Sequence, residues 1–161
     1  MLFKRTLLYS HYFKHLISSE LSYICFADMD TDLEITKVMN IVHGVIELRS
    51  DNILSFRPNA ATFKNYDHKV LSDLLEAFIE ITEGIPRPYL CDNSYVSGIV
   101  NKEELAYMNE NFGRFATHAA MITSSNLIRV LLNSYNTLFK PKVELRLFNS
   151  EKKAVEWLLS K

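Results

Sequence analysis

Hydrophobic and polar positions follow a regular pattern from Gly44 to the end of the chain. Residues 45–49 and 53–57 are two runs rich in residues typical of strands, and the short polar residues 50–52 separate them. Ser, Asp and Asn tolerate the positive φ that a tight turn demands. The pattern therefore predicts an antiparallel hairpin, after which helices and strands alternate.

Four helices are predicted from apolar residues at helical spacing between capping and stop signals. They cover residues 67–82, 101–113 and 126–138 and a last segment that starts at Ser150. In the second helix, Asn101 and Glu104 form a capping-box pattern, and Gly113 is the expected stop. The apolar residues of the third helix are Leu127, Ile128, Leu131, Leu132, Tyr135 and Leu138.

Three further strands are predicted between these helices, at residues 89–91, 116–122 and 143–147. The run 116–122 carries small residues that allow helices to approach from either face, as in the central strand of a covered sheet. The order β-β-α-β-α-β-α-β-α predicts one α/β domain with a mixed sheet of about five strands and about four helices. The N-terminal hairpin is antiparallel in this arrangement, and the remaining strands are mostly parallel.

Residues 1–40 lack this regularity and are predicted to be an N-terminal extension of uncertain structure, ahead of a domain at 41–161. A helix over Arg5–Phe26 is one interpretation of this segment. The internal methionines Met29 and Met39 lead to the hypothesis that the working protein starts at one of them and lacks the residues before it.

Length and composition narrow the classes of function. The chain has 161 residues, of which 48% are hydrophobic and 23% charged, as in a single globular domain. Its net charge of -1 creates no field of one sign, so nucleic-acid binding is not expected. Stable membrane insertion is not expected either, because no window of the sequence approaches the roughly 20 consecutive apolar residues of a membrane span. The chain has only two cysteines, Cys25 and Cys91, which predicts reducing surroundings and a cytoplasmic location.

Several short segments resemble a known family. They are the opening hairpin, Pro88-Tyr89-Leu90-Cys91-Asp92-Asn93-Ser94-Tyr95-Val96, the Ala119–Ile122 strand and the ending Leu147–Glu151 with Ala154, Trp157 and Leu158. With them, the region from about Ile41 to Lys161 resembles a STAS domain, the fold of anti-sigma factor antagonists of the SpoIIAA type. More closely, it resembles small stand-alone STAS-like proteins of bacteria, some of which are labelled STAS/SEC14 domain-containing. The resemblance implies a regulatory domain and brings no catalytic residue.

The family's switch is a serine at the start of the helix that follows Asp-x-Ser-x-Val, where phosphorylation controls binding to an anti-sigma factor. The corresponding stretch here is residues 99–104, and Asn101 occupies the helix start. A serine kinase cannot phosphorylate asparagine, and Glu103 and Glu104 disfavour a further anion in this turn. The usual phosphorylatable serine is therefore missing.

Polar residues follow the predicted parallel strands at their carboxyl ends, where open α/β sheets tend to bind ligands. Together with the start of the second helix, they are our candidate residues for binding a partner or ligand: Asp92, Asn93, Ser94, Asn101, Thr123, Ser124, Ser125 and Arg129. Arg129 is the candidate anion partner. The alternative interpretation is that these residues are ordinary caps and turns, which Ser, Asp and Asn favour.

No set of catalytic or metal-binding residues is predicted. His118 and Cys91 lie in apolar strands and are interpreted as buried core residues. His11 and His15 stand one helical turn apart, but no third metal ligand follows at a suitable spacing. The glycines form no phosphate-binding loop. We therefore expect no catalytic residue, no metal and no cofactor.

The first hypothesis for function is a non-enzymatic regulator or adaptor that contacts a protein partner or forms a homodimer. Its expected contact surface surrounds Asp92, Ser94, Asn101 and the exposed start of the helix at 102–112. The alternative is a small-molecule or lipid-binding module with a pocket at the strand ends or beneath that helix.

The residues Tyr107, Met108, Phe112 and Phe115 fit either the lining of such a pocket or an ordinary core. A third hypothesis, an enzyme that uses His118 with Asp92 or a nearby serine, has the least support, because nothing in the sequence places these groups within hydrogen-bond reach.

Overall fold

The computed structural model describes residues 33–63, 65–96 and 100–161, apart from the side chains at positions 131 and 138. Residues from Glu34 to Lys161 form one compact unit. The predicted helix Arg5–Phe26, the pair His11 and His15, Cys25 and the alternative start at Met29 lie outside the described residues.

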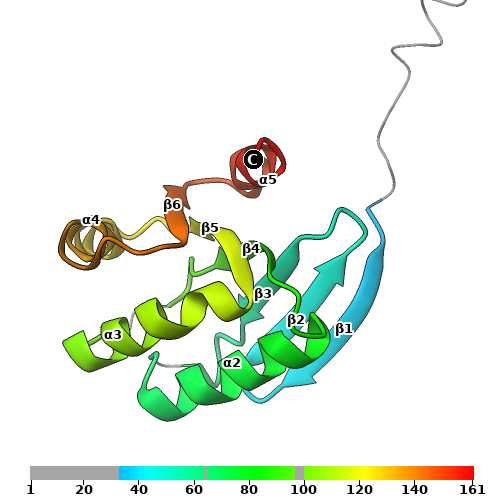
Figure 1. The fold of residues 1–161 in the computed structure, drawn as a ribbon, viewed down its shortest axis with the longest axis horizontal. Helices are drawn as coiled ribbons and strands as arrows, with labels where there is room; N and C mark the ends of the chain where they lie inside the picture. Colours follow the sequence, from blue (N-terminus) through cyan, green and yellow to red (C-terminus); the bar gives the residue numbers. More distant parts are fainter. Residues whose placement is uncertain (1–32, 64, 97–99) are drawn as a thin grey trace, which may run out of the picture. The chain divides into compact units, whose positions relative to one another are not determined.

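A six-stranded mixed sheet forms the centre of this unit (Figure 1). Its strands lie side by side in chain order: β1 (Ile35–Ile41), β2 (Gly44–Arg49), β3 (Leu54–Pro58), β4 (Arg87–Asp92), β5 (Ala116–Ile122) and β6 (Glu144–Phe148). The first three pair antiparallel, and β3 to β6 pair parallel. The predicted α/β architecture is confirmed, with six strands in place of about five.

The additional strand is β1, which lies almost entirely within the first 40 residues, the segment predicted to be an extension of uncertain structure. It is an edge strand with mostly exposed side chains, and only Met39 and Ile41 pack against the core. Because few of its positions are buried, the strand lacks the clear alternation that marks a half-buried strand. A chain that began at Met39 would lose most of β1.

The β2–β3 hairpin has the turn that the sequence predicts. Asn52 adopts a φ of 65°, and the carboxylate of Asp51 accepts a hydrogen bond from the backbone N–H of Ile53 at 3.2 Å. Gly44 begins β2 with a φ of 154°, and a Cβ there would lie 2.3 Å from the carbonyl oxygen of Arg57. Only glycine fits this close approach of backbones.

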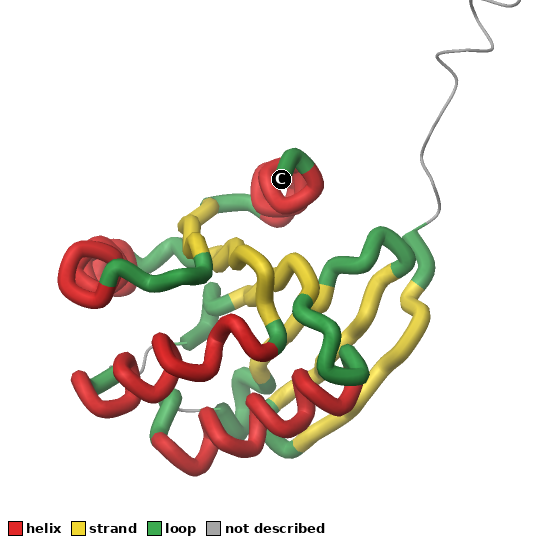
Figure 2. Tube along the Cα trace, viewed as in Figure 1, coloured by secondary structure: helices red, strands yellow, loops and turns green. Residues whose placement is uncertain are grey.

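Four α-helices cover the sheet in the described part of the chain: α2 (His68–Ile81), α3 (Lys102–Asn111), α4 (Asn126–Phe139) and α5 (Glu151–Leu159). The first three cross between neighbouring parallel strands. Because these strands follow chain order and such crossovers are right-handed, α2, α3 and α4 belong to the same face of the sheet. Helix α5 covers the opposite face (Figures 1 and 2).

We call the face under α2, α3 and α4, which carries Phe56, Tyr89 and Met121, the crossover face, and the other, which carries Leu90 and Ala120, the α5 face. The crossover face holds a large core in which aromatic rings meet edge to face, such as Phe56 and Phe78 with ring centroids 5.6 Å apart. The α5 face holds a small core. Ala119 and Ala120 are fully buried on opposite faces, so β5 is covered on both faces as predicted, although it is the fifth of the six strands and not a central one.

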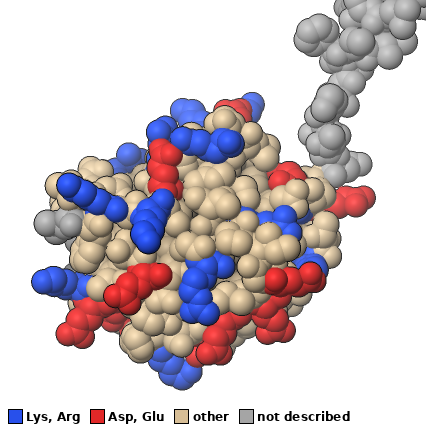
Figure 3. Space-filling view, in the orientation of Figure 1, with Lys and Arg blue, Asp and Glu red and all other residues tan. Residues whose placement is uncertain are grey.

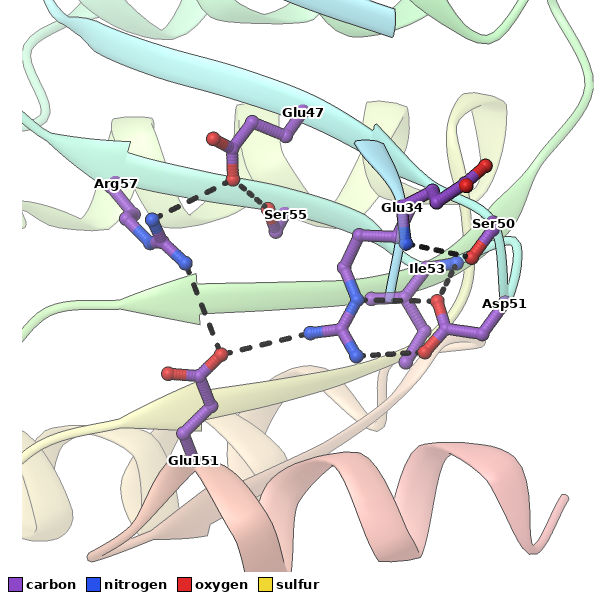
Figure 4. A network of polar contacts seen from close by, with 9 residues as sticks. Glu34, Glu47, Ser50, Asp51, Ile53, Ser55, Arg57 and Glu151 are labelled. Atoms are coloured by element: carbon purple, nitrogen blue, oxygen red, sulfur yellow. Dashed lines mark hydrogen bonds and ion pairs between the residues drawn. The ribbon is translucent and has the colours of Figure 1, made fainter. Parts of the chain in front are cut away.

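A network of ion pairs connects α5 to the β2–β3 hairpin (Figure 4). The guanidinium of Arg49, whose side chain is only 6% exposed, donates to Asp51 at 2.7 Å and lies 3.6 Å from Glu151 in the first turn of α5. Arg57 bridges Glu151 and Glu47 at 4.0 and 3.7 Å. The sequence analysis did not predict this network, because Glu151 is far from the hairpin in sequence.

Candidate functional site

An apolar pocket lies between the crossover face and the three helices α2, α3 and α4. Its volume is about 100 Å³. The four residues that the sequence assigned to either a pocket or a core, Tyr107, Met108, Phe112 and Phe115, all line it. Leu74 and Phe78 of α2 and Ile128 and Leu132 of α4 complete its apolar walls.

Helix α3 forms one side of the pocket and begins with the predicted capping box. Asn101 Oδ1 accepts hydrogen bonds from the N–H groups of Glu103 and Glu104 at 2.9 and 3.0 Å, and Glu104 Oε2 accepts one from the Asn101 N–H at 2.8 Å. No residue of α3 is fully buried. Gly113, the predicted stop, has no positive φ; the chain instead tightens into the 3₁₀ turn η1 (Phe112–Arg114).

Asn93 lies at the polar end of the pocket and is 2% exposed. Its Oδ1 accepts hydrogen bonds from the Tyr66 hydroxyl at 2.6 Å and from the Cys91 thiol at 3.1 Å. Its Nδ2 donates to the thioether sulfur of Met121 at 3.2 Å. The sequence analysis treated Asn93 as a candidate binding residue at the end of a strand. In the structure, hydrogen bonds to Tyr66, Cys91 and Met121 keep its side chain buried.

Burial controls the protonation of the groups around Asn93. It raises the pKa of the Cys91 thiol to about 11, and it raises the pKa of the Tyr66 hydroxyl well above its ordinary value. Both groups therefore stay neutral near pH 7 and act as hydrogen-bond donors. The interpretation of Cys91 as a small buried residue agrees with this environment.

Asp92 and Ser94 flank Asn93 at the end of β4 and form a turn. Asp92 Oδ1 accepts hydrogen bonds from the Ser94 N–H at 3.0 Å and from its hydroxyl at 2.6 Å. Both side chains thus form hydrogen bonds within the turn, as the alternative interpretation of caps and turns expects. The next residue, Tyr95, is 80% exposed.

The candidate residues after β5 are brought to the same edge, because Asp92 lies opposite Ile122 in the sheet. Thr123 is buried, and its hydroxyl accepts a hydrogen bond from the Ser125 N–H at 3.1 Å. Ser125 in turn caps α4, with its hydroxyl 3.4 Å from the Ile128 N–H. Ser124 is exposed, and Arg129 is half-buried on α4.

Helix α4 has apolar residues on two sides, which the sequence analysis missed. Ile128 and Leu132 line the pocket, whereas Leu127 and Val130 are 55% and 62% exposed. Leu127, which the sequence groups with the other apolar residues of this helix, is therefore not part of the core. The spacing contained the signal, since Leu127 and Val130 fall outside the stripe at 128, 132 and 135.

We call Asp92, Ser94, Tyr95, Asn101, Leu127 and Val130 the strand-end surface, because they follow the carboxyl ends of β4 and β5. It combines exposed apolar side chains with the acidic first turn of α3. Basic and acidic side chains are interspersed over the face of the molecule in Figure 3.

The groups of the enzyme hypothesis do not meet. Asp92 lies opposite Ile122, four residues beyond His118 along β5. The His118 ring instead contacts the carbonyl oxygen of Leu158 at 2.9 Å and the Thr117 hydroxyl at 3.0 Å. Among the described residues, no group of His, Cys, Asp and Glu is arranged to hold a metal ion. In the same part of the chain, no helix has the length and apolar character needed to cross a membrane.

Comparisons with known proteins place the fold. The family model described as Domain of unknown function (DUF7793) matches residues 46–160. The structure is similar to the crystal structure of an uncharacterized protein from the DUF3478 family with a SpoIIAA-like fold, from Shewanella loihica PV-4. The TM-score is 0.50 with 15% sequence identity, and the match covers 78% of this chain and 93% of that one. No curated protein matches the sequence. The SpoIIAA-like fold, predicted from the sequence, is confirmed.

Proposed function

The chain belongs to the DUF7793 family, and we propose that it is a non-enzymatic regulatory or adaptor domain that contacts a protein partner through the strand-end surface. It works in the cytoplasm and without the usual phosphorylatable serine, since Asn101 caps α3 in its place. The hydrogen bonds of His118 and Asp92 within the fold support a role without catalysis.

The observation that carries this proposal is the exposure of Tyr95, Leu127 and Val130 near one end of the sheet. Aromatic and aliphatic side chains that are exposed together are typical anchors of protein interfaces. Glu103 and Glu104 add negative charge at the start of α3. A fitting partner surface therefore has an apolar recess for Tyr95 and basic residues around it.

Site-specific photo-crosslinking in cells tests the proposal. A benzophenone amino acid replaces Tyr95 in one variant, and it replaces Val42, which is 66% exposed in the β1–β2 turn, in the control variant. We expect one predominant crosslinked product from position 95 and none of the same mass from position 42. A crosslinked product of twice the chain mass would identify the partner as a second copy of this chain. Identical products from both positions, or none from position 95, contradict the proposal.

The pocket favours a second candidate function, the binding of a small molecule. Apolar pockets with a few placed polar groups are the usual ligand sites of proteins. A volume of about 100 Å³ suits a compact molecule and is too small for a long acyl chain, so this candidate is a small-molecule module and not a carrier of long-chain lipids.

A further inference from the structure

We infer that the pocket beneath α3 binds a compact, mostly apolar ligand that presents one hydrogen-bond acceptor to the side-chain amide of Asn93. This inference rests on the second candidate function and names its ligand class. It is independent of the protein contact at the strand-end surface.

The size of the pocket limits the ligand. A volume of about 100 Å³ is below that of an engineered apolar protein cavity of roughly 150 Å³ that stays dry and binds benzene. One ring or a short branched chain is therefore the upper limit without movement of α3, and a ring with a short substituent requires a small shift of this helix, none of whose residues is fully buried. Burial of each CH₂-sized group favours binding, and an empty apolar cavity forgoes these contacts.

The lining favours an aromatic ring. Tyr89, Phe112 and Phe115 all line the pocket, and their rings pack edge to face with centroids 5.0 to 5.8 Å apart. A further ring can join such a cluster in the same geometry, which stabilises aromatic pairs beyond the burial of area.

Asn93 determines the polar group of the ligand. Its Oδ1 already accepts two hydrogen bonds, from Tyr66 and Cys91. A side-chain amide has two N–H donors, yet within the described residues Nδ2 has one acceptor, the thioether sulfur of Met121. Thioether sulfur is a weak acceptor. A donor that is 98% buried but poorly satisfied gains more from a ligand acceptor than an exposed donor would.

The orientation of Asn93 follows from the same contacts. The Tyr66 hydroxyl and the Cys91 thiol both lie on its Oδ1 side, and both are neutral donors because burial raises their pKa values. The amide hydrogens therefore point away from them, toward Met121 and the pocket. A ligand that offers only donors would meet an Asn93 Oδ1 that already accepts two hydrogen bonds.

Two probes of nearly identical shape separate the contribution of the hydrogen-bond acceptor to the affinity from that of the apolar ring. Benzonitrile carries a nitrile nitrogen, which accepts hydrogen bonds, and phenylacetylene carries a C–H group at the same place. Ligand-observed NMR titrations with the full chain give both affinities. We expect benzonitrile to bind about fivefold more tightly, as one added hydrogen bond predicts. The infrared C≡N stretch of bound benzonitrile should shift as it does in a hydrogen-bonding solvent.

Matched variants locate the binding. Leu105→Trp fills the pocket from α3, whereas Leu159→Trp makes the same change at an exposed position of α5. We expect Leu105→Trp to abolish binding of both probes and Leu159→Trp to leave both affinities unchanged. If Leu105→Trp does not fold by circular dichroism, Val100→Phe, which also reaches the pocket, replaces it.

The outcomes separate the inference from the function on which it rests. Equal affinities for the two probes, lost in Leu105→Trp, overturn the acceptor at Asn93 but keep the small-molecule site. Absence of binding for both probes, or binding that survives Leu105→Trp, overturns the site as well. Decanoate that binds more tightly than benzonitrile overturns the compact ligand class. None of these results depends on the crosslinking at Tyr95.

Discussion

The α5 face and the crossover face of the sheet are packed by different kinds of side chain. On the α5 face, Ala120 and Ala154 are both fully buried, so the helix lies close to the sheet and leaves little room. On the crossover face, the large aromatic side chains leave a pocket of about 100 Å³. Protein interiors are normally close-packed, so the difference separates a face built for rigidity from a face that has room for a ligand.

Two buried polar groups show the same contrast, although the indole N–H of Trp157, which packs against the core of the α5 face, lacks a hydrogen-bond partner among the described residues. On the α5 face, Arg49 has carboxylate partners on both sides, Asp51 and Glu151. On the crossover face, the buried amide of Asn93 has a thioether as the acceptor for Nδ2. Ionic groups that are satisfied inside the fold hold it in one arrangement, whereas a poorly satisfied donor beside a pocket is available to a ligand.

The largest effect is expected from truncation on the tightly packed face. Leu158→Ala removes a side chain that is 2% exposed and should lower the free energy of unfolding by about 3 kcal/mol. Leu105→Ala, at the half-buried wall of the pocket, should cost about 1 kcal/mol. Urea unfolding followed by Trp157 fluorescence measures both. Equal losses would contradict the difference between the faces.

Enlargement of a side chain should distinguish the two faces in the same order as truncation. Ala154→Leu inserts volume where α5 meets the sheet and should destabilise the protein by about 2 kcal/mol. Leu105→Trp inserts volume beside the pocket and should leave the free energy of unfolding within about 0.5 kcal/mol of the parent. The same urea titrations test this, and a large loss in Leu105→Trp would show that the pocket has no usable space.

Loss of the ionic network should have a smaller effect. Arg49→Met keeps a similar length but leaves Asp51, whose side chain is 20% exposed, without its cation. We expect a loss of about 1.5 kcal/mol, below the value for fully buried pairs because solvent reaches Asp51 and Glu151. The control is Arg146→Met, whose side chain is 54% exposed and should change stability by less than about 0.5 kcal/mol.

The smallest effect concerns alkaline pH. The folded-state pKa of Cys91 is about 11, above its ordinary value of 9.0, so the unfolded chain loses the thiol proton first. The protonated Cys91 thiol therefore makes its full contribution to the free energy of unfolding below pH 9. This contribution is lost as the pH rises toward the folded-state pKa. We expect a loss of about 1 kcal/mol between roughly pH 8 and 10.

Cys91→Ala provides the control for this pH dependence. It should be less stable than the parent near neutral pH, because it removes a buried side chain, but its stability should fall less between the two pH values. Equal slopes in the two proteins would show that other groups, such as the Tyr66 and Tyr89 hydroxyls with their raised pKa values, dominate.

Local signals in the sequence were sufficient for much of the fold. The positive φ of Asn52, the capping box of Asn101 and the two-faced burial of Ala119 and Ala120 follow from residue chemistry within a few positions. The edge strand β1 gave no such signal, because burial did not impose an alternating pattern on it.

The candidate site was less predictable because its contacts join distant segments. Sequence chemistry indicated polar residues at the strand ends, but it could not show that Asn93 lies under Tyr66 and Met121 while Ser94 faces solvent. For the same reason, the aromatic residues of the second predicted helix fitted both a pocket and a core. The space that remains around these aromatic side chains depends on where α2 and α4 pack, which the local sequence does not determine.

Hydrogen–deuterium exchange on the protein alone and in the complex identified by crosslinking is the direct test of the proposed contact at the strand-end surface. We expect slower exchange in residues 92–96, at the start of α3 and in the first turns of α4, with α5 and the β2–β3 hairpin unchanged. Protection centred on α5 or on the hairpin, with an unchanged strand-end surface, would contradict it.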